Sequence, residues 1–139
     1  MESTYGGRHH RPMPATVREF EEAINATLAA GGNVVVPTFA LERAQEILYG
    51  LREAVEHGRV SPQLKVFVDS PMAHSAVEIF RRHPECYDPG ALDVLETRDP
   101  FEWPGLTYAR DRVESKAINA VRHGALILAG SGMCTGGRV

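Results

Sequence analysis

The feature that most constrains this chain is a regular alternation of short apolar runs with amphipathic stretches. Apolar runs occur at residues 34–36, 66–68 and 125–129, and turn-forming residues follow them. Between these runs, apolar residues recur every three or four positions, as they do on one face of a helix. Strands that alternate with helices are typical of parallel βαβ units with right-handed crossovers. The sequence therefore predicts an α/β fold, with a parallel, Rossmann-like sheet flanked by helices.

Capping residues predict where several helices begin. Thr16 and Glu19 fit a capping box for the first helix, and Asp111 and Glu114 fit another near the end of the chain. Ser70, directly before a proline, is a favoured N-cap residue. We therefore expect helices to start close to residues 16, 70 and 111.

Two regions give weaker signals. Leu41 is expected to open the buried face of the second helix, which Gly58 closes. Residues 84–105 contain repeated Pro and Gly, so we expect a long irregular excursion with one helical turn. Residues 106–108 form a weak strand candidate.

Length and composition bound the classes of protein that remain. A chain of 139 residues suits one domain, and no apolar run is long enough to span a membrane. The formal charge of −3 argues against a stand-alone nucleic-acid binder, although a local anion site is compatible with it. Two isolated cysteines and an N-terminus without a signal-peptide pattern favour a reducing cytoplasm.

Polar residues follow the predicted strands, and parallel sheets bind ligands beyond the carboxyl ends of their strands. Thr38, Ser70 and Ser131 come after three different strands, so their hydroxyls are expected at one edge of the sheet. Asp69 also ends a strand. Its carboxylate fits either a general base or metal ligand, or a cap for the following helix. Arg43, in the first turn of its helix, opposes the helix dipole and so suggests an anionic partner.

The segment from Gly130 to Arg138 is the sharpest local signal. It contains four glycines, two hydroxyl residues and one arginine. Backbone amides turned to a common point, with hydroxyls and a guanidinium, suit a phosphate oxygen. The alternatives are an ordinary turn, or an arginine that pairs with an internal carboxylate. The candidate phosphate-binding residues of this loop are Ser131, Gly132, Thr135, Gly136, Gly137 and Arg138.

Neither the cysteines nor the histidines predict a complete site. Cys134 fits a nucleophile or, better, a small residue in a tight loop, since His123 is the nearest histidine in sequence. The six histidines lack the compact spacing of zinc ligands, so no metal site is expected within the chain.

Five blocks in order resemble the β-CASP region of metallo-β-lactamase-fold nucleases that process RNA. That family includes the cleavage and polyadenylation endonuclease and bacterial ribonucleases. The blocks cover nearly the whole chain, and the last is the most specific. They are Glu2-Ser3-Thr4-Tyr5-Gly6 with Arg8 and His10, Pro37-Thr38-Phe39-Ala40 with Arg43-Ala44-Gln45-Glu46, Val68-Asp69-Ser70-Pro71-Met72-Ala73, Glu114-Ser115-Lys116-Ala117-Ile118-Asn119, and Ala129 to Arg138.

The resemblance implies a cassette that forms a lid over a two-zinc site, with RNA in the cleft beside a metallo-β-lactamase domain of the same polypeptide. The zinc ions would activate a hydroxide and polarise the scissile phosphate. The family's zinc ligands would lie upstream of Glu2 and beyond Val139. Residues 1–10 would join the two domains and residues 11–139 would form a β-CASP domain that is incomplete at its C-terminal end.

Residue roles also follow from the resemblance. Glu2 would tune the histidine that acts as general acid. Thr38, Arg43 and the Gly-rich loop would line the RNA path. Ser70, at a neighbouring strand end, is expected to complete the phosphate pocket. RNA and the metallo-β-lactamase domain are the expected partners, and a homodimer is compatible with the sequence. We expect the isolated chain to be inactive. The alternatives are a non-catalytic nucleotide- or phosphate-binding module and an inactive pseudonuclease subunit.

Overall fold

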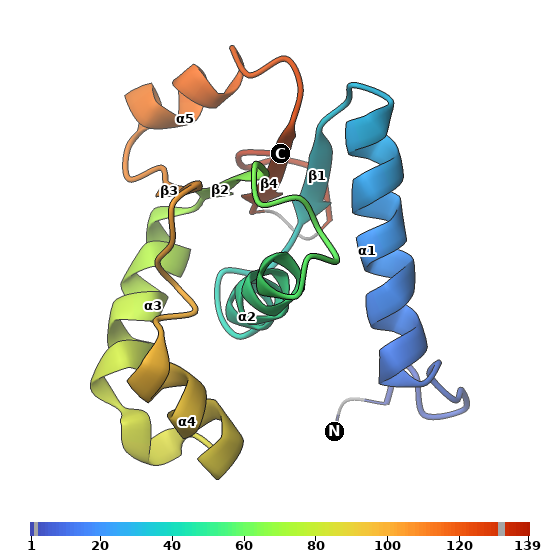
Figure 1. Ribbon diagram of the computed structural model, residues 1–139, viewed down its shortest axis with the longest axis vertical. Helices are drawn as coiled ribbons and strands as arrows, with labels where there is room; N and C mark the ends of the chain where they lie inside the picture. The colour runs from blue at the N-terminus through green and yellow to red at the C-terminus, as the bar shows by residue number, and fades with distance from the viewer. Residues whose placement is uncertain (2, 131–132) are drawn as a thin grey trace.

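The computed structural model describes residues 1, 3–130 and 133–139. Within this part of the chain, four parallel strands form one sheet in the order β1-β4-β2-β3, with helices around it (Figure 1). This arrangement confirms the predicted α/β class. The strands are β1 (Val34–Pro37), β2 (Lys65–Asp69), β3 (Leu106–Tyr108) and β4 (Ala125–Ala129). The helices are α1 (Met13–Ala29), α2 (Arg43–Glu56), α3 (Pro71–Arg82), the 3-10 turn η1 (Pro84–Cys86), α4 (Pro89–Thr97) and α5 (Arg112–Ile118).

Strand β4 lies between β1 and β2, although it comes last in the sequence. Leu128 of β4 is in register with Val36 of β1 on one side and with Val68 of β2 on the other. Its composition explains this position, because all five residues are apolar. Four of the five are buried in the structure. A strand without polar side chains suits the middle of a parallel sheet.

The core fills the space between one face of the sheet and helices α1, α2 and α3. Leu126 and Leu128 of β4 pack there with Leu48 of α2, and each of the three is almost fully buried. Side chains alternate along a strand, so Ile127 faces the other way and is only partly buried. The start of α5 reaches this second face. Ser115 contacts Asp69 there, one position beyond the core residue Val68.

Two predicted helix starts are wrong. Helix α1 begins at Met13, after Pro12, so the capping box at Thr16 and Glu19 does not form. Thr16 instead donates back to the carbonyl of Pro12, and Glu19 pairs with Arg11. Pro14 lies in the first turn, where its fixed φ is helical and its missing N–H would be unpaired anyway. This preference outweighs the Thr16 signal.

Helix α2 begins at Arg43, and not at Leu41. Glu42 precedes the helix with φ at +65°, and Leu41 is 59% exposed. The expected buried face is nevertheless present from Ala44 onward. Gly58 follows the helix with φ at +67°, as its predicted role requires.

Residues 84–105 are more ordered than expected, because η1 and α4 lie within them. Asp88 caps α4 by accepting a hydrogen bond from the N–H of Ala91 at 3.0 Å. Arg81 of α3 holds the following loop through Asp99, with a nitrogen–oxygen distance of 2.7 Å. The prolines here begin helical turns and do not break them. Pro84 occupies the first position of η1, and Pro89 occupies the first position of α4.

The other local predictions are confirmed. Ser70 caps α3 by accepting a hydrogen bond from the N–H of Ala73, and Asp111 caps α5. The weak strand at residues 106–108 is β3, which pairs with β2. No helix within the described residues is long and apolar enough to cross a membrane. The division of the chain near residue 10 stays a prediction.

Candidate functional site at the carboxyl edge of the sheet

The sheet order brings the predicted loops together, because β1, β4 and β2 are neighbours and end at one edge. The N–H of Thr38 donates to the carbonyl of Ala129 at 3.0 Å. A Cβ atom added to Gly130 would lie 4.0 Å from the carbonyl oxygen of Thr38. The loop after β1 therefore lies directly against the start of the Gly-rich loop. Three predicted site residues, Glu2, Ser131 and Gly132, lie outside the described residues.

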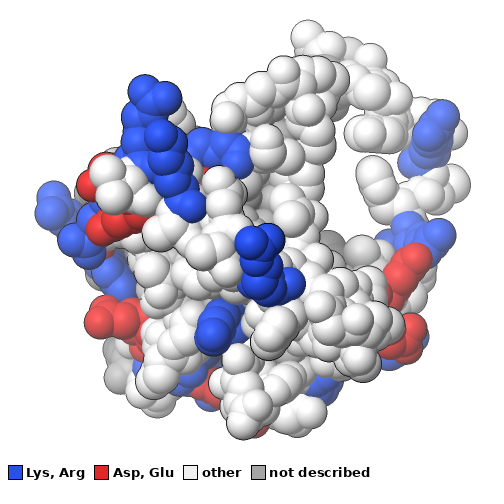
Figure 2. Space-filling model, turned by 90° about the horizontal axis from the view of Figure 1, so that it is seen from above, with Lys and Arg blue, Asp and Glu red and all other residues white. Residues whose placement is uncertain are grey.

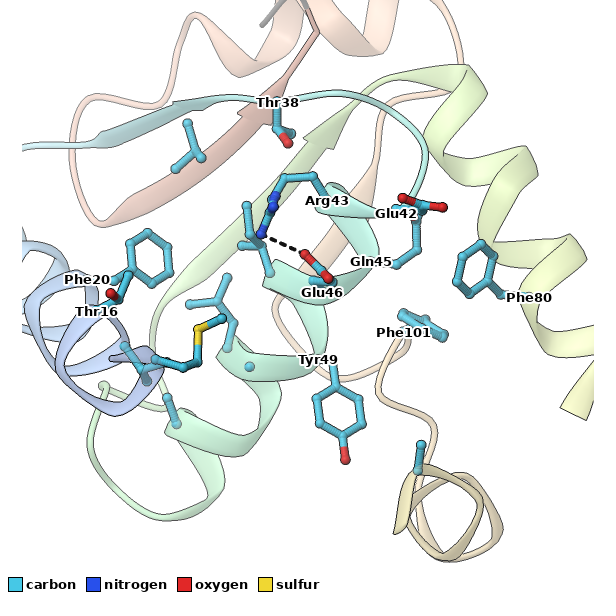
Figure 3. A pocket seen from close by; sticks show the side chains of 18 of the residues that line it. Thr16, Phe20, Thr38, Glu42, Arg43, Gln45, Glu46, Tyr49, Phe80 and Phe101 are labelled. Atoms are coloured by element: carbon cyan, nitrogen blue, oxygen red, sulfur yellow. Dashed lines mark ion pairs between the residues drawn. The ribbon is translucent and has the colours of Figure 1, made fainter. Parts of the chain in front are cut away.

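Thr38 is more enclosed than a simple surface ligand. The residue is 6% exposed, and its hydroxyl makes a long contact of 3.4 Å with the carbonyl of Phe39. Figure 3 shows this hydroxyl on the side of the loop that faces Arg43. Phe39, the next residue, is 69% exposed. The loop thus presents an aromatic ring to solvent beside a nearly buried hydroxyl.

Arg43 lies at the first position of α2, where the prediction placed it. Its guanidinium pairs with Glu46 one helical turn later, at 2.7 Å (Figure 3). Both side chains are more than 60% exposed. An exposed pair of this kind contributes roughly 0.2–0.5 kcal/mol. Exchange of this partner for a phosphate would therefore cost little.

Ser70 has two roles available to it. Its oxygen accepts the N–H of Ala73 at 3.2 Å, which caps α3. A hydroxyl that accepts one hydrogen bond can still donate another. The residue is half-buried at the end of β2, so its proton can reach a ligand at the sheet edge.

Asp69 does not take either predicted role. It is 4% exposed, and Ser70 caps the helix in its place. Its Oδ2 accepts the hydroxyl of Ser115 at 2.7 Å, and its Oδ1 accepts Nη1 of Arg138 at 2.7 Å. A carboxylate with both oxygens engaged in this way is a structural anchor. The predictions missed this anchoring role because its two partners are distant in sequence. Ser115 lies 46 positions and Arg138 lies 69 positions from Asp69, and spacing alone cannot pair residues so far apart.

Arg138 adopts the internal pairing that the sequence left as an alternative. Besides Asp69, its Nη1 donates to the carbonyl of Asp111 at 3.0 Å. Its backbone N–H closes the Gly-rich loop by donating to the carbonyl of Gly130 at 2.8 Å. The guanidinium therefore ties the loop to β2 and to the start of α5. A contact between Arg138 and an RNA phosphate stays a prediction.

The rest of the Gly-rich loop is open to solvent. Thr135, Gly136 and Gly137 are exposed. Gly137 has φ at +84° and Cys134 has φ at +52°, so the loop makes two left-handed turns. Glycine adopts this conformation without a steric penalty, whereas the side chain of Cys134 makes it unfavourable. Exposed backbone with this geometry can direct amides at an anion. Cys134 is exposed, and not the enclosed residue that was the favoured expectation.

Sequence reasoning missed Gln45, which holds the Thr38 loop in place. The residue is 2% exposed. Its Nε2 donates to the carbonyl of Ala40 at 3.1 Å and to that of Ala73 at 3.4 Å. It thus connects the loop before α2 to the first turn of α3. The resemblance included this position, but nothing in the local pattern marked it as buried.

Sequence reasoning also missed a large groove along α2, with a volume of about 1200 Å³. Figure 3 shows Phe20 on one side of this helix and Phe80 and Phe101 on the other. The lining is mainly apolar, so the groove does not resemble a phosphate site. Thr38 and Arg43 border it at the end nearest the sheet edge.

No group of three or more His, Cys, Asp or Glu residues in the described ranges could hold a metal ion. The resemblance places the ligands of the two-zinc centre upstream of Glu2 and beyond Val139, and the described residues supply no such group. Any such centre needs ligands from elsewhere.

A parallel sheet flanked by helices, with a Gly-rich loop at its carboxyl edge, agrees with the α/β class that the β-CASP resemblance implies. The model of the Beta-Casp domain family matches residues 44–139. The chain therefore belongs to the Beta-Casp domain family. It is 42% identical over 139 residues to Ribonuclease TTHA0252 of Thermus thermophilus. The matched region covers 99% of this chain and 32% of that relative.

Two other relatives match almost the whole chain. Transcription termination factor FttA of Thermococcus kodakarensis is 33% identical over 141 residues, covering 99% of the chain and 21% of that protein. Endoribonuclease ysh1 of Schizosaccharomyces pombe is 28% identical over 136 residues, covering 98% and 17%. The chain spans about a third or less of the length of these curated relatives.

Proposed function

We propose that this chain is the RNA-binding part of a zinc-dependent ribonuclease that hydrolyses phosphodiester bonds. The observation that carries the proposal is the meeting of the Thr38 and Gly130 loops at one sheet edge, in a chain 42% identical to a ribonuclease. Zinc, when bound by another segment of the full polypeptide, would supply an activated hydroxide. The chain's own residues would hold the RNA backbone against that centre.

The proposed contacts use groups that can donate to phosphate oxygens. Arg43 offers an exposed guanidinium, and Ser70 offers a hydroxyl proton. Thr135 and the amides of Gly136 and Gly137 would complete the path from the Gly-rich loop. Arg138 would act from within this loop, by fixing its shape through Asp69. Phosphate contacts of this kind position RNA without reading its sequence.

The test compares the purified chain with the full polypeptide that contains it. We expect stoichiometric zinc and metal-dependent RNA cleavage from the full polypeptide. The chain alone should show neither, because a catalytic zinc needs about three protein ligands. Cleavage by residues 1–139 with bound zinc would refute this division of labour.

A second measurement addresses Glu2, whose role rests on the resemblance. In the full polypeptide, Glu2→Gln should slow single-turnover cleavage far more than it weakens RNA binding. A residue that tunes a general acid acts on the transition state and leaves the ground state nearly unchanged. An unchanged single-turnover rate would mean that Glu2 has no part in the chemistry.

A further inference from the structure

The 15 cations of this chain include two groups that matter here, besides Arg8, Arg18, Lys65 and Arg82, which also lack an ion pair among the described residues. Seven arginines pair with carboxylates, and they are Arg11, Arg43, Arg52, Arg59, Arg81, Arg98 and Arg138. A second group lies on α5 and on its two flanks. Arg110, Arg112, Lys116 and Arg122 are all exposed, and none pairs with a carboxylate of any described residue. We call these four residues the α5 track.

The two carboxylates of this segment bind backbone N–H groups at the start of the helix, and neither forms an ion pair with a cation of the α5 track. Oδ1 of Asp111 accepts the N–H groups of Val113 and Glu114, at 2.7 and 2.9 Å. The carboxylate of Glu114 accepts the N–H of Arg110 at 2.7 Å. Residues 110–122 therefore hold four cations against two carboxylates and keep a net positive charge, on a chain whose formal charge is −3.

The arrangement within α5 is unfavourable unless an anion lies nearby. Arg112 and Lys116 are four residues apart, so they lie on the same face of the helix. Like charges at this spacing destabilise a helix by roughly 0.2–0.5 kcal/mol. On the face shown in Figure 2, Lys and Arg are more prominent than Asp and Glu on the side where α5 lies in Figure 1.

The α5 track begins beside the candidate site and leads away from it. Nη1 of Arg138 donates to the carbonyl of Asp111, which places the start of α5 against the Gly-rich loop. At the other end, Arg122 lies just before β4. The N–H of Lys65 donates there to the carbonyl of Gly124 at 3.2 Å, so a further exposed cation begins β2 at this edge. Cations thus extend from the carboxyl edge of the sheet to its amino edge.

We propose that the α5 track binds the phosphate backbone of an RNA strand outside the site at the carboxyl edge. This inference rests on the proposed function, because it takes RNA as the ligand. Contacts between exposed cations and phosphates release counterions, so they are independent of sequence and strongly dependent on salt. The track would therefore favour long RNA over short RNA, whatever the base sequence.

The experiment measures the affinity of the purified chain for labelled RNA at several salt concentrations. The RNAs are one of about 8 nucleotides and one of about 40, which bracket a typical single-strand site. Arg112→Gln/Lys116→Gln removes two cations of the α5 track. Arg18→Gln/Arg82→Gln is the matched control, because it removes two exposed, unpaired cations from α1 and α3 and changes net charge equally.

We expect the α5 variant to bind the long RNA about tenfold more weakly at low salt. Its logarithmic salt slope should fall by roughly 1.4, since each phosphate contact on a single strand contributes about 0.7. Its affinity for the short RNA, and the affinities of the control variant, should stay within about twofold of the unsubstituted chain.

Each other outcome has a distinct meaning. Equal losses in the α5 and control variants would reduce the effect to net charge and overturn the α5 track. Loss of short-RNA binding in the α5 variant would place these cations in the main site and would also overturn it. If the α5 variant binds long RNA with an unchanged salt slope, the α5 track is overturned and the proposed function remains intact. If the unsubstituted chain binds neither RNA, both proposals fail.

Discussion

Nη1 of Arg138 lies 2.7 Å from Oδ1 of Asp69, across 69 positions of sequence. Asp69 is nearly buried at the end of β2, and Arg138 is about one-quarter exposed at the end of the Gly-rich loop. The hydroxyl of Ser115 engages the second carboxylate oxygen. One carboxylate thus fixes a loop and a helix to the sheet. The loop geometry at the candidate site therefore depends on an interaction that need not touch RNA.

Replacement of Arg138 by Ala should destabilise the chain, because it leaves the Asp69 carboxylate buried without its cation. We expect a loss on the order of 2–4 kcal/mol and a fall in Tm of roughly 5–15 °C. Arg43→Ala is the control, since its exposed pair with Glu46 should change Tm by little. A double-mutant cycle with Asp69→Asn measures the coupling. Additive effects of the two substitutions would show that the pair contributes nothing to stability.

The Gly-rich loop offers a matched pair of glycines. Gly137 has φ at +84°, whereas Gly136 has no such conformation and has open space around an added Cβ. Gly137→Ala should therefore cost about 1–2 kcal/mol, and Gly136→Ala should be nearly neutral. Thermal unfolding and RNA affinity of both variants test this. Equal effects would mean that the left-handed turn at Gly137 relaxes freely.

Gln45 allows a test of how the Thr38 loop is held. Gln45→Glu replaces the donating Nε2 by an oxygen that faces two carbonyl oxygens, and it buries a charge. Gln45→Leu removes the hydrogen bonds without adding charge, at a cost of about 1–3 kcal/mol for the unpaired acceptors. We expect Gln45→Glu to lower the Tm more than Gln45→Leu. The reverse order would mean that the amide contributes through its shape and not through donation.

Tyr108 predicts a pH dependence at high pH. Burial raises the pKa of its phenol above the ordinary value of 10.0, and its hydroxyl donates to the carbonyl of Phe101 at 3.0 Å. A group whose pKa is raised by folding stabilises the fold below its unfolded pKa. This contribution is lost as pH rises from about 10 toward the raised pKa. Unfolding free energies measured from neutral to strongly alkaline pH should fall less steeply above pH 10 in Tyr108→Phe. Parallel curves would contradict this.

Local signals predicted most of the elements. Apolar runs identified β1, β2 and β4, because buried parallel strands carry few polar residues. Ser70 and Asp111 identified helix starts, since a short polar side chain at the N-cap accepts the unpaired N–H groups of the first helical turn. The errors at Thr16 and Leu41 occurred where a proline or an unusual φ decided the boundary. Proline also misled the prediction for residues 84–105, where it begins helices.

The candidate site was predictable only in part. Parallel strands end at one edge, so the meeting of the loops after β1 and β4 followed from topology. The partners of Asp69 could not be predicted from topology. Ser115 and Arg138 come close to this buried carboxylate only in the folded chain. The burial of Gln45 depends in the same way on the packing of α2 against α3. The groove along α2 is also a product of packing.

The central place of β4 has a consequence for the order in which the molecule can be assembled. Strands β1 and β2 do not pair with each other, and each pairs with β4, whose residues come about 60 to 90 positions later. Closing such long loops slows folding, since chain entropy is lost before the contacts form. During synthesis, β1 would therefore remain without a strand partner until residues 125–129 have been made. Nascent chains that lack residues 125–129 should remain protease-sensitive, and completion of β4 should confer resistance in one step.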